Sequence, residues 1–150
     1  MCTMRYSTHM IAFRLTFQPG VPVYQQVVYA AKKAIIAGQM RPGDRFPSVR
    51  TLSQELKINP NTAHKVVTQL ISEGLIAVHP GRGTLVAELP ASTARERTQL
   101  LKGELEALVV EAMRLRMGLG DVQAALSEHW ERLGSDARSS GTVPRKGEKP

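Results

Sequence analysis

Cysteine is almost absent from this chain of 150 residues, which contains only Cys2. A single cysteine excludes an internal disulfide framework and a zinc site built from several cysteines. No apolar run approaches the roughly 18 residues that a membrane-spanning helix requires. The first residues also lack the long apolar segment of a secretory signal. We therefore expect a soluble cytoplasmic protein without a membrane-spanning segment.

Motifs of the common enzyme classes are missing as well. The chain has no nucleophile elbow, no phosphate-binding loop, no HExxH zinc motif and no glycine-rich dinucleotide turn. Its four histidines fall in four different predicted elements, with no pair at metal-ligand spacing. They are His9, His64, His79 and His129. We predict that the protein is not an enzyme and has neither a cofactor nor a metal site.

Acidic residues are outnumbered, since 20 Lys and Arg face 13 Asp and Glu and leave a formal net charge of +7. Such an excess favours a polyanionic partner, either nucleic acid or an anionic membrane surface. The excess is uneven along the chain. Residues 21–90 contain eight basic and four acidic residues, whereas residues 91–134 contain six basic and seven acidic ones. This division predicts a binding half followed by an assembly half. Because the second half has no net positive charge, a membrane surface loses its support and no membrane partner is expected.

The first half contains signals for three helices and a hairpin. After a short β-prone run at 11–17, apolar spacing predicts a helix over 22–37, which Gly38 ends. Its apolar stripe begins at Tyr24 and continues through Val28, Ala31 and Ile35. Ser48 is a suitable N-cap for a short helix up to Lys57, and Asn59 with Pro60 begins a third helix over 60–73. Two β-prone runs, 75–79 and 84–88, flank a turn of proline and glycines. This order predicts a winged helix-turn-helix domain over residues 10–89.

The second half changes character after Pro90. Apolar residues recur at helical spacing and predict a long amphipathic helix over 92–117, followed by a last helix that Asp121 caps. The stripe consists of Leu101, Leu105, Leu108, Ala112, Leu115 and Leu119. We expect residues 91–134 to form a helical dimerisation segment and residues 135–150 a disordered tail. The fold class is thus mainly α with a small β-hairpin wing, followed by two C-terminal helices.

The third helix carries the main chemical signal. Its inward stripe is predicted to bury Ala63, Val66, Val67, Leu70 and Ile71. On the polar face that remains, Asn61, Lys65 and Thr68 follow at i, i+4 and i+7. Thr62, His64 and Gln69 are also predicted to be exposed. Asn and Gln can pair with adenine, Thr can contact thymine, and Lys suits guanine or a phosphate. The alternative is that this is the ordinary polar face of an amphipathic helix.

Two arginines extend the candidate surface. Arg50 lies in the first turn of the second helix, where a DNA backbone would pass, although an ion pair with Glu55 is an alternative. Arg82 lies between Gly81 and Gly83 at the hairpin tip. The glycines would permit a close approach while Arg82 enters a minor groove or meets a phosphate. The alternative is a solvated arginine in an ordinary turn.

The ordered combination of these motifs resembles the DNA-binding domain of GntR-family bacterial transcription regulators. The shared features are Pro42-Gly43-Asp44, Pro47-Ser48-x-Arg50, Glu73-Gly74-Leu75 and Gly81-Arg82-Gly83-Thr84, and the match covers about residues 10–88. The sequence Asn59-Pro60-Asn61-Thr62 and the opening at 21–26 resemble the YtrA-like subfamily. The resemblance implies DNA contacts at or near Arg50, Asn59, Asn61, Thr62, His64, Lys65, Gly81 and Arg82. Pro60 departs from the family, because it replaces an arginine and cannot supply that contact.

The function that follows is a homodimeric, sequence-specific transcription regulator, specifically a repressor that reads a palindromic operator. The subfamily resemblance implies control of a transporter-type operon. The apolar stripe could be intramolecular core, but two helices beside a compact domain cannot cover both of their apolar faces. The stripe therefore predicts dimerisation, which the resemblance also implies, through Leu101, Leu105, Leu108, Ala112 and Leu115. Residues 91–134 are too few to enclose a metabolite pocket of the usual size, so the effector stays unknown. The alternatives are a protein-interaction module and an architectural binder that is indifferent to DNA sequence.

Overall fold

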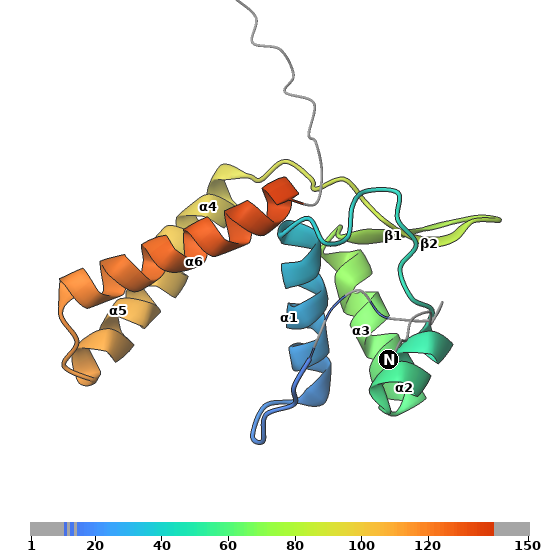
Figure 1. Ribbon diagram of the computed structural model, residues 1–150, viewed down its shortest axis with the longest axis horizontal. Coiled ribbons are helices and arrows are strands. Elements are labelled where there is room, and N and C mark those ends of the chain that lie inside the picture. The colour runs from blue at the N-terminus through green and yellow to red at the C-terminus, as the bar shows by residue number, and fades with distance from the viewer. Residues whose placement is uncertain (1–10, 12, 14, 140–150) are drawn as a thin grey trace, which may run out of the picture. The chain divides into compact units, whose positions relative to one another are not determined.

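The computed structural model describes residues 11, 13 and 15–139, which divide into two compact units (Figure 1). The first unit contains the described residues up to Leu89 together with residues 136–139, and the second contains Pro90–Ser135.

Three helices build the first unit: α1 (Val23–Ile36), α2 (Val49–Leu56) and α3 (Pro60–Ser72). Their apolar stripes face a common core, to which Val27, Leu52, Val66 and Leu70 contribute fully buried side chains. Burial of each such side chain stabilises the fold by roughly 1.5–3 kcal/mol. The sequence also predicts a buried Ile71, but this prediction is wrong, because its side chain is 40% exposed.

The helix starts follow the predicted caps. The Ser48 side chain accepts a hydrogen bond from the Thr51 N–H at 3.1 Å, and Asn59 Oδ1 accepts from the Asn61 N–H at 2.7 Å. Between the two helices, Ser53 Oγ donates to the Ile58 carbonyl at 2.7 Å. These short-range bonds fix the turn from α2 into α3.

The predicted hairpin forms from β1 (Ile76–His79) and β2 (Gly83–Val86), which pair antiparallel in the register Ile76 to Val86. A third segment, not predicted from the sequence, lies along β2. The Gly43 N–H donates to the Val86 carbonyl at 2.9 Å, and the Phe46 N–H donates to the Thr84 carbonyl at 2.8 Å. The loop before α2 therefore closes the edge of the wing.

The β-prone run at 11–17 forms no strand at the positions that the structure describes. Phe13 is instead buried and lies parallel to Phe46, with 6.4 Å between the ring centroids. Ile11 and Leu15 pack against the same core. These three apolar residues of the run thus serve core packing, whereas Phe17 is 41% exposed.

In the second unit, three consecutive segments replace the single predicted α-helix over 92–117. They are α4 (Ala94–Gln99), the π-helical turn η1 (Leu100–Glu104) and α5 (Leu105–Arg114). The last helix, α6 (Leu119–Ser139), begins before Asp121, whose carboxylate accepts from the Gly118 N–H at 3.1 Å. Asp121 is therefore a first-turn residue and not the N-cap. The tail predicted from 135 is wrong for residues 135–139, which are helical, and residues 140–150 lie outside the described residues.

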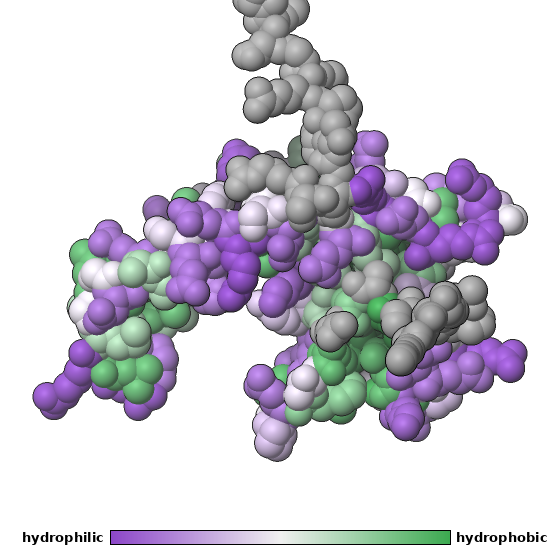
Figure 2. All heavy atoms as spheres, viewed as in Figure 1, coloured by the Kyte–Doolittle hydropathy of each residue, from purple (hydrophilic) through white to green (hydrophobic). Residues whose placement is uncertain are grey.

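The second unit buries little of its apolar surface. Among its described residues, Ala112 alone is buried, while Leu101, Leu108 and Trp130 are 62%, 49% and 78% exposed. Hydrophobic residues accordingly lie on the visible face of this unit in Figure 2. Within the part of the chain that the structure describes, no helix has the length and apolar character needed to cross a membrane.

Candidate nucleic-acid interface

The polar face of α3 is the centre of the candidate interface. Asn61, His64, Lys65 and Thr68 are exposed along it, and Thr62 is half-buried. On the opposite face, Ala63, Val66 and Leu70 are fully buried and hold the helix against α1 and α2. The sequence pattern separated most of these two faces, although Ile71, predicted to be buried, is exposed and Thr62, predicted to be exposed, is half-buried. The remaining predicted contact residues of α3 share one accessible surface.

The N-terminus of α3 is organised by Asn59. Its side-chain oxygen caps the Asn61 N–H, and Pro60 occupies the first helical position, where its missing N–H costs nothing. The Asn59 oxygen is therefore used within the protein. Its amide nitrogen can still donate to a DNA phosphate, as can the other free backbone N–H groups of the first turn.

Lys65 has a partner that the sequence did not predict. Its ammonium nitrogen lies 3.9 Å from the centroid of the Tyr24 ring, near the N-terminus of α1. The apolar spacing of α1 assigned Tyr24 to the core stripe, and the side chain does pack against the core while it remains half-buried. The ring face of Tyr24 thus contacts a residue of the candidate interface. The sequence pattern alone indicates only a core position for Tyr24.

Arg50 lies in the first turn of α2 and is exposed. It does not form the ion pair with Glu55 that the sequence left open, because no carboxylate among the described residues lies within 4.0 Å of its guanidinium. The five N–H donors of an arginine without such a partner can bind phosphate oxygens in a bidentate way.

The tip of the wing presents Arg82 between two glycines with positive φ, 77° at Gly81 and 85° at Gly83. The Arg82 N–H donates to the His79 carbonyl at 3.0 Å and closes the turn. A Cβ atom at either glycine would meet nothing within 4 Å, so backbone conformation and not crowding explains these glycines. Hydrophilic residues gather along the hairpin in Figure 2.

The charges of this face favour an anion. The ion pairs between described residues are Lys32 with Glu73 and Arg114 with Glu111. Arg50, Lys65 and Arg82 take part in neither, so their positive charges are not neutralised by a described carboxylate. The described residues also include no group of three or more His, Cys, Asp or Glu that could hold a metal ion.

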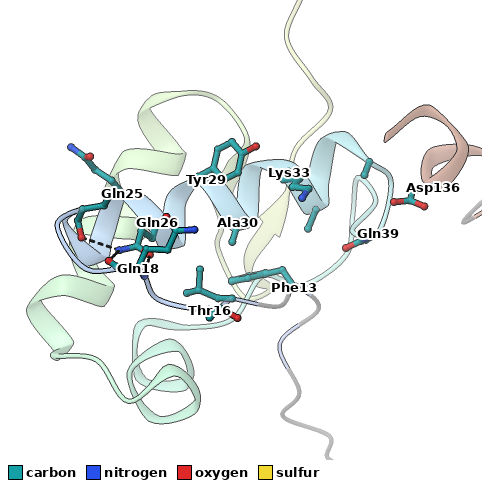
Figure 3. A pocket seen from close by; sticks show the side chains of 14 residues that line it. Phe13, Thr16, Gln18, Gln25, Gln26, Tyr29, Ala30, Lys33, Gln39 and Asp136 are labelled. Carbon is teal, nitrogen blue, oxygen red and sulfur yellow. Dashed lines mark hydrogen bonds between the residues drawn. The ribbon is translucent and has the colours of Figure 1, made fainter. Parts of the chain in front are cut away.

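The first unit also has a groove beside α1, which residues between Phe13 and Val21 help to line (Figure 3). It measures about 810 Å³ and is lined by apolar residues such as Phe13 and Ala34, together with Lys33. The side chain of Gln26 closes one end of the groove. Its Nε2 donates to the Val21 carbonyl at 2.8 Å and to the Gln18 carbonyl at 3.0 Å, and its Oε1 accepts from the Gln18 N–H at 2.7 Å. The groove has the volume of a small-molecule site but is open to solvent, so it does not enclose a ligand.

Comparison with known proteins identifies similar chains. A family model described as bacterial regulatory proteins, gntR family, matches residues 23–86, which extend from α1 to the end of β2. The chain is 37% identical over 94 residues to the HTH-type transcriptional repressor YtrA of Bacillus subtilis (strain 168), which covers 62% of this chain and 72% of that protein. It is also 35% identical over 71 residues to the vitamin B6 salvage pathway transcriptional repressor PtsJ of Salmonella typhimurium, which covers 47% and 16%.

Solved structures support the fold. A transcriptional antiterminator from Listeria monocytogenes EGD-e superposes with a TM-score of 0.72 at 20% identity, over 90% of this chain and 97% of that one. A transcriptional regulator from Oenococcus oeni gives a TM-score of 0.53 at 25% identity, over 77% and 97%. The predicted class, a mainly α winged helix with a two-stranded wing and C-terminal helices, is confirmed.

Proposed function

Because the chain belongs to the GntR family of bacterial regulatory proteins, a family of transcription regulators rather than enzymes, we propose that it is a homodimeric repressor of a palindromic DNA operator. One observation carries this proposal. The exposed polar face of α3 lies on the same unit as Arg50 and Arg82, two cations without a described carboxylate partner. A helix of this kind fits the major groove, and such cations fit the flanking phosphates.

The α3 side chains divide by the contacts that they can make. Asn61 and Thr62 lie in the first turn, which enters deepest into the groove in helix-turn-helix docking. Asn can bond adenine in a bidentate way, and Thr can contact a thymine methyl group. His64 and Thr68 are exposed further along and would contact base edges or the sugar-phosphate backbone. We assign sequence discrimination chiefly to Asn61.

Residues outside α3 would position the domain on the duplex. Arg50 and the amide of Asn59 would bind phosphates beside the groove that α3 occupies. Arg82 would enter the adjacent minor groove or bind its phosphates, and Gly81 would let the wing backbone approach. These contacts set orientation and affinity, whereas the base contacts of α3 set specificity.

The second unit would supply the dimer contact. Leu101, Leu105, Leu108 and Leu115 are between 38% and 62% exposed, and they lie with Ala112 on the stripe of η1 and α5. A helical segment with so little buried surface has few stabilising contacts of its own. A symmetric dimer would bury these leucines and present two α3 helices to two half-sites.

The biological role follows from the same proposal. Similarity to the repressor YtrA favours repression, and the subfamily resemblance favours control of a transporter-type operon. Since the operator lies in chromosomal DNA, the protein would act in the bacterial cytoplasm. The effector stays unknown, and the groove beside α1 is open to solvent.

In vitro selection from random-sequence duplexes, followed by a salt titration, tests this function. We expect a palindromic sequence to be enriched. If each protomer neutralises about four phosphates, the log–log slope of affinity against salt should be near −7. N61A should lose about 1–3 kcal/mol on the selected duplex and little on a scrambled one. Enrichment of no sequence would favour an architectural binder, and the absence of DNA binding would favour a protein-interaction module.

A further inference from the structure

We propose that Tyr24 is a positioning residue that makes Lys65 a phosphate contact instead of a base contact. The inference rests on the proposed function and concerns the same DNA-binding face. It starts from the 3.9 Å separation between the Lys65 ammonium nitrogen and the centroid of the Tyr24 ring. The sequence left both roles open for Lys65, because lysine suits guanine as well as phosphate.

The ring of Tyr24 is a fixed platform. Tyr24 is half-buried and packs against the hydrophobic core of the first unit, and its hydroxyl oxygen accepts a hydrogen bond from Gln25 Nε2 at 3.3 Å. A lysine has a long, flexible side chain and loses considerable rotamer freedom when it is immobilised. Because the ring attracts the ammonium group before DNA arrives, part of that entropic cost is already met in the free protein.

The direction of the lysine side chain explains the choice of ligand. Asn61 and Lys65 are one helical turn apart on α3, so both could extend toward bases. The ammonium group of Lys65 instead lies over a residue of α1, a helix that would not enter the groove in this docking mode. The Lys65 ammonium group would therefore meet the DNA sugar-phosphate backbone that borders the major groove.

The chemistry of the ammonium group fits this position. Reading guanine requires two acceptors in a defined plane, whereas a phosphate requires only a nearby positive charge. Lys65 is exposed, so one side of its ammonium group faces the ring while its remaining N–H donors stay available to an anion. An ammonium group that lies against the Tyr24 ring can therefore bind a phosphate, which does not require a defined hydrogen-bond plane.

The test uses the full chain and two probes, a duplex obtained by in vitro selection and a scrambled duplex of the same composition. K65M should weaken binding to both probes by the same factor. It should also reduce the magnitude of the salt slope by about 0.9 per protomer. A loss confined to the selected duplex, with an unchanged slope, would overturn the assignment of Lys65 to phosphate.

A double-mutant cycle tests the part of Tyr24. Y24L should weaken binding to both probes by about two- to tenfold per protomer, because Lys65 must then be ordered on binding. The same substitution should have no further effect in the K65M background, and Y24F should restore most of the affinity, because it keeps the aromatic ring. An equal loss from Y24L with and without Lys65 would mean that Tyr24 acts only through packing.

Loss of folding and failure of the proposed function are detected by different measurements. Circular dichroism and thermal unfolding of each variant show whether the domain is intact, and Y24F keeps the comparison valid if Y24L unfolds. If the wild-type chain selects no sequence, sequence-specific repression fails. The salt slopes of wild type and K65M on a duplex of arbitrary sequence then still decide whether Lys65 binds phosphate.

Discussion

The Lys32 ammonium group lies 2.6 Å from the Glu73 carboxylate and joins α1 to the C-cap of α3. The contact between Lys65 and Tyr24 joins the same two helices toward their N-terminal ends. From the first contact to the second, the position moves eight residues along α1 (Tyr24 to Lys32) and eight residues in the same sense along the α3 segment (Lys65 to Glu73). The two helices therefore run in the same direction and are connected at two points along their contact. The orientation of the candidate DNA-reading helix therefore depends on α1 as well as on the core.

The first prediction concerns this ion pair. E73Q keeps an acceptor for Gln69 Nε2, which donates to Glu73 at 3.3 Å, but removes the charge opposite Lys32. Because both side chains are partly exposed, the unfolding free energy should fall by about 0.5 kcal/mol, and by less at high salt. Urea unfolding at two salt concentrations measures this. E88Q, at an exposed carboxylate without an ion pair to a described cation, is the matched control, and equal effects of both changes would contradict the prediction.

The elements that the sequence predicted well depend on neighbours along the chain. Ser48 and Asn59 cap helices through groups two or three residues away, so their identities alone located the starts of α2 and α3. The division of α3 into a buried and an exposed face also follows from local spacing. These features brought the predicted site residues of α3 onto one surface.

The features that the sequence missed depend on distant residues. The segment from Gly43 to Phe46 pairs with β2, about forty residues away, and nothing in its own pattern specifies that partner. The aromatic contact of Lys65 likewise needs the packing of α1 against α3. Asp121 was misplaced for another reason, since an acidic residue near a helix start suits both the N-cap and the first turn.

The conformation of the wing gives the second prediction. Gly81 has φ 77°, a left-handed value that costs an alanine about 1–2 kcal/mol. G81A should therefore destabilise the domain by about 1 kcal/mol, without any steric clash, because a Cβ would meet nothing within 4 Å. Urea unfolding measures the loss. G81N should cost less, because asparagine tolerates the left-handed region, and a larger loss for G81N than for G81A would contradict this explanation.

The start of α4 gives a pH-dependent prediction. The Thr93 N–H and hydroxyl donate to the Glu96 carboxylate at 2.7 and 2.8 Å, and these hydrogen bonds lower the pKa of Glu96 below its ordinary value of 4.5. A carboxyl group whose folded pKa is lowered stabilises the fold above its unfolded pKa. The capping box should therefore be fully effective above about pH 4.5 and should be lost as the pH falls through the lowered pKa.

An NMR titration of the Glu96 side-chain carboxyl group checks this directly. The wild-type midpoint should lie below 4.5, and T93A should raise it toward that value. T93S, which keeps the hydroxyl donor, should leave the midpoint low. A midpoint that does not respond to T93A would show that the Thr93 hydroxyl makes no contribution to the shift.

The last prediction concerns the leucine stripe of α5. Leu108 is 49% exposed on the stripe, and Val110 is 59% exposed on the same helix. Two residues along an α-helix correspond to a rotation of roughly 200°, so the two side chains point to nearly opposite sides. L108E would place a charge in the proposed dimer contact, where desolvation without a partner is costly, whereas V110E would leave that charge in water.

Sedimentation velocity of both variants separates these outcomes. The wild-type chain and V110E should sediment as dimers, and L108E should sediment as a monomer. L108E should also bind the selected palindrome far more weakly than V110E, because only a dimer places two α3 helices on two half-sites at once. If L108E remains dimeric, the leucine stripe is not the dimer contact. If V110E also dissociates, the contact is not confined to one face of α5, and the symmetric arrangement proposed above must use both.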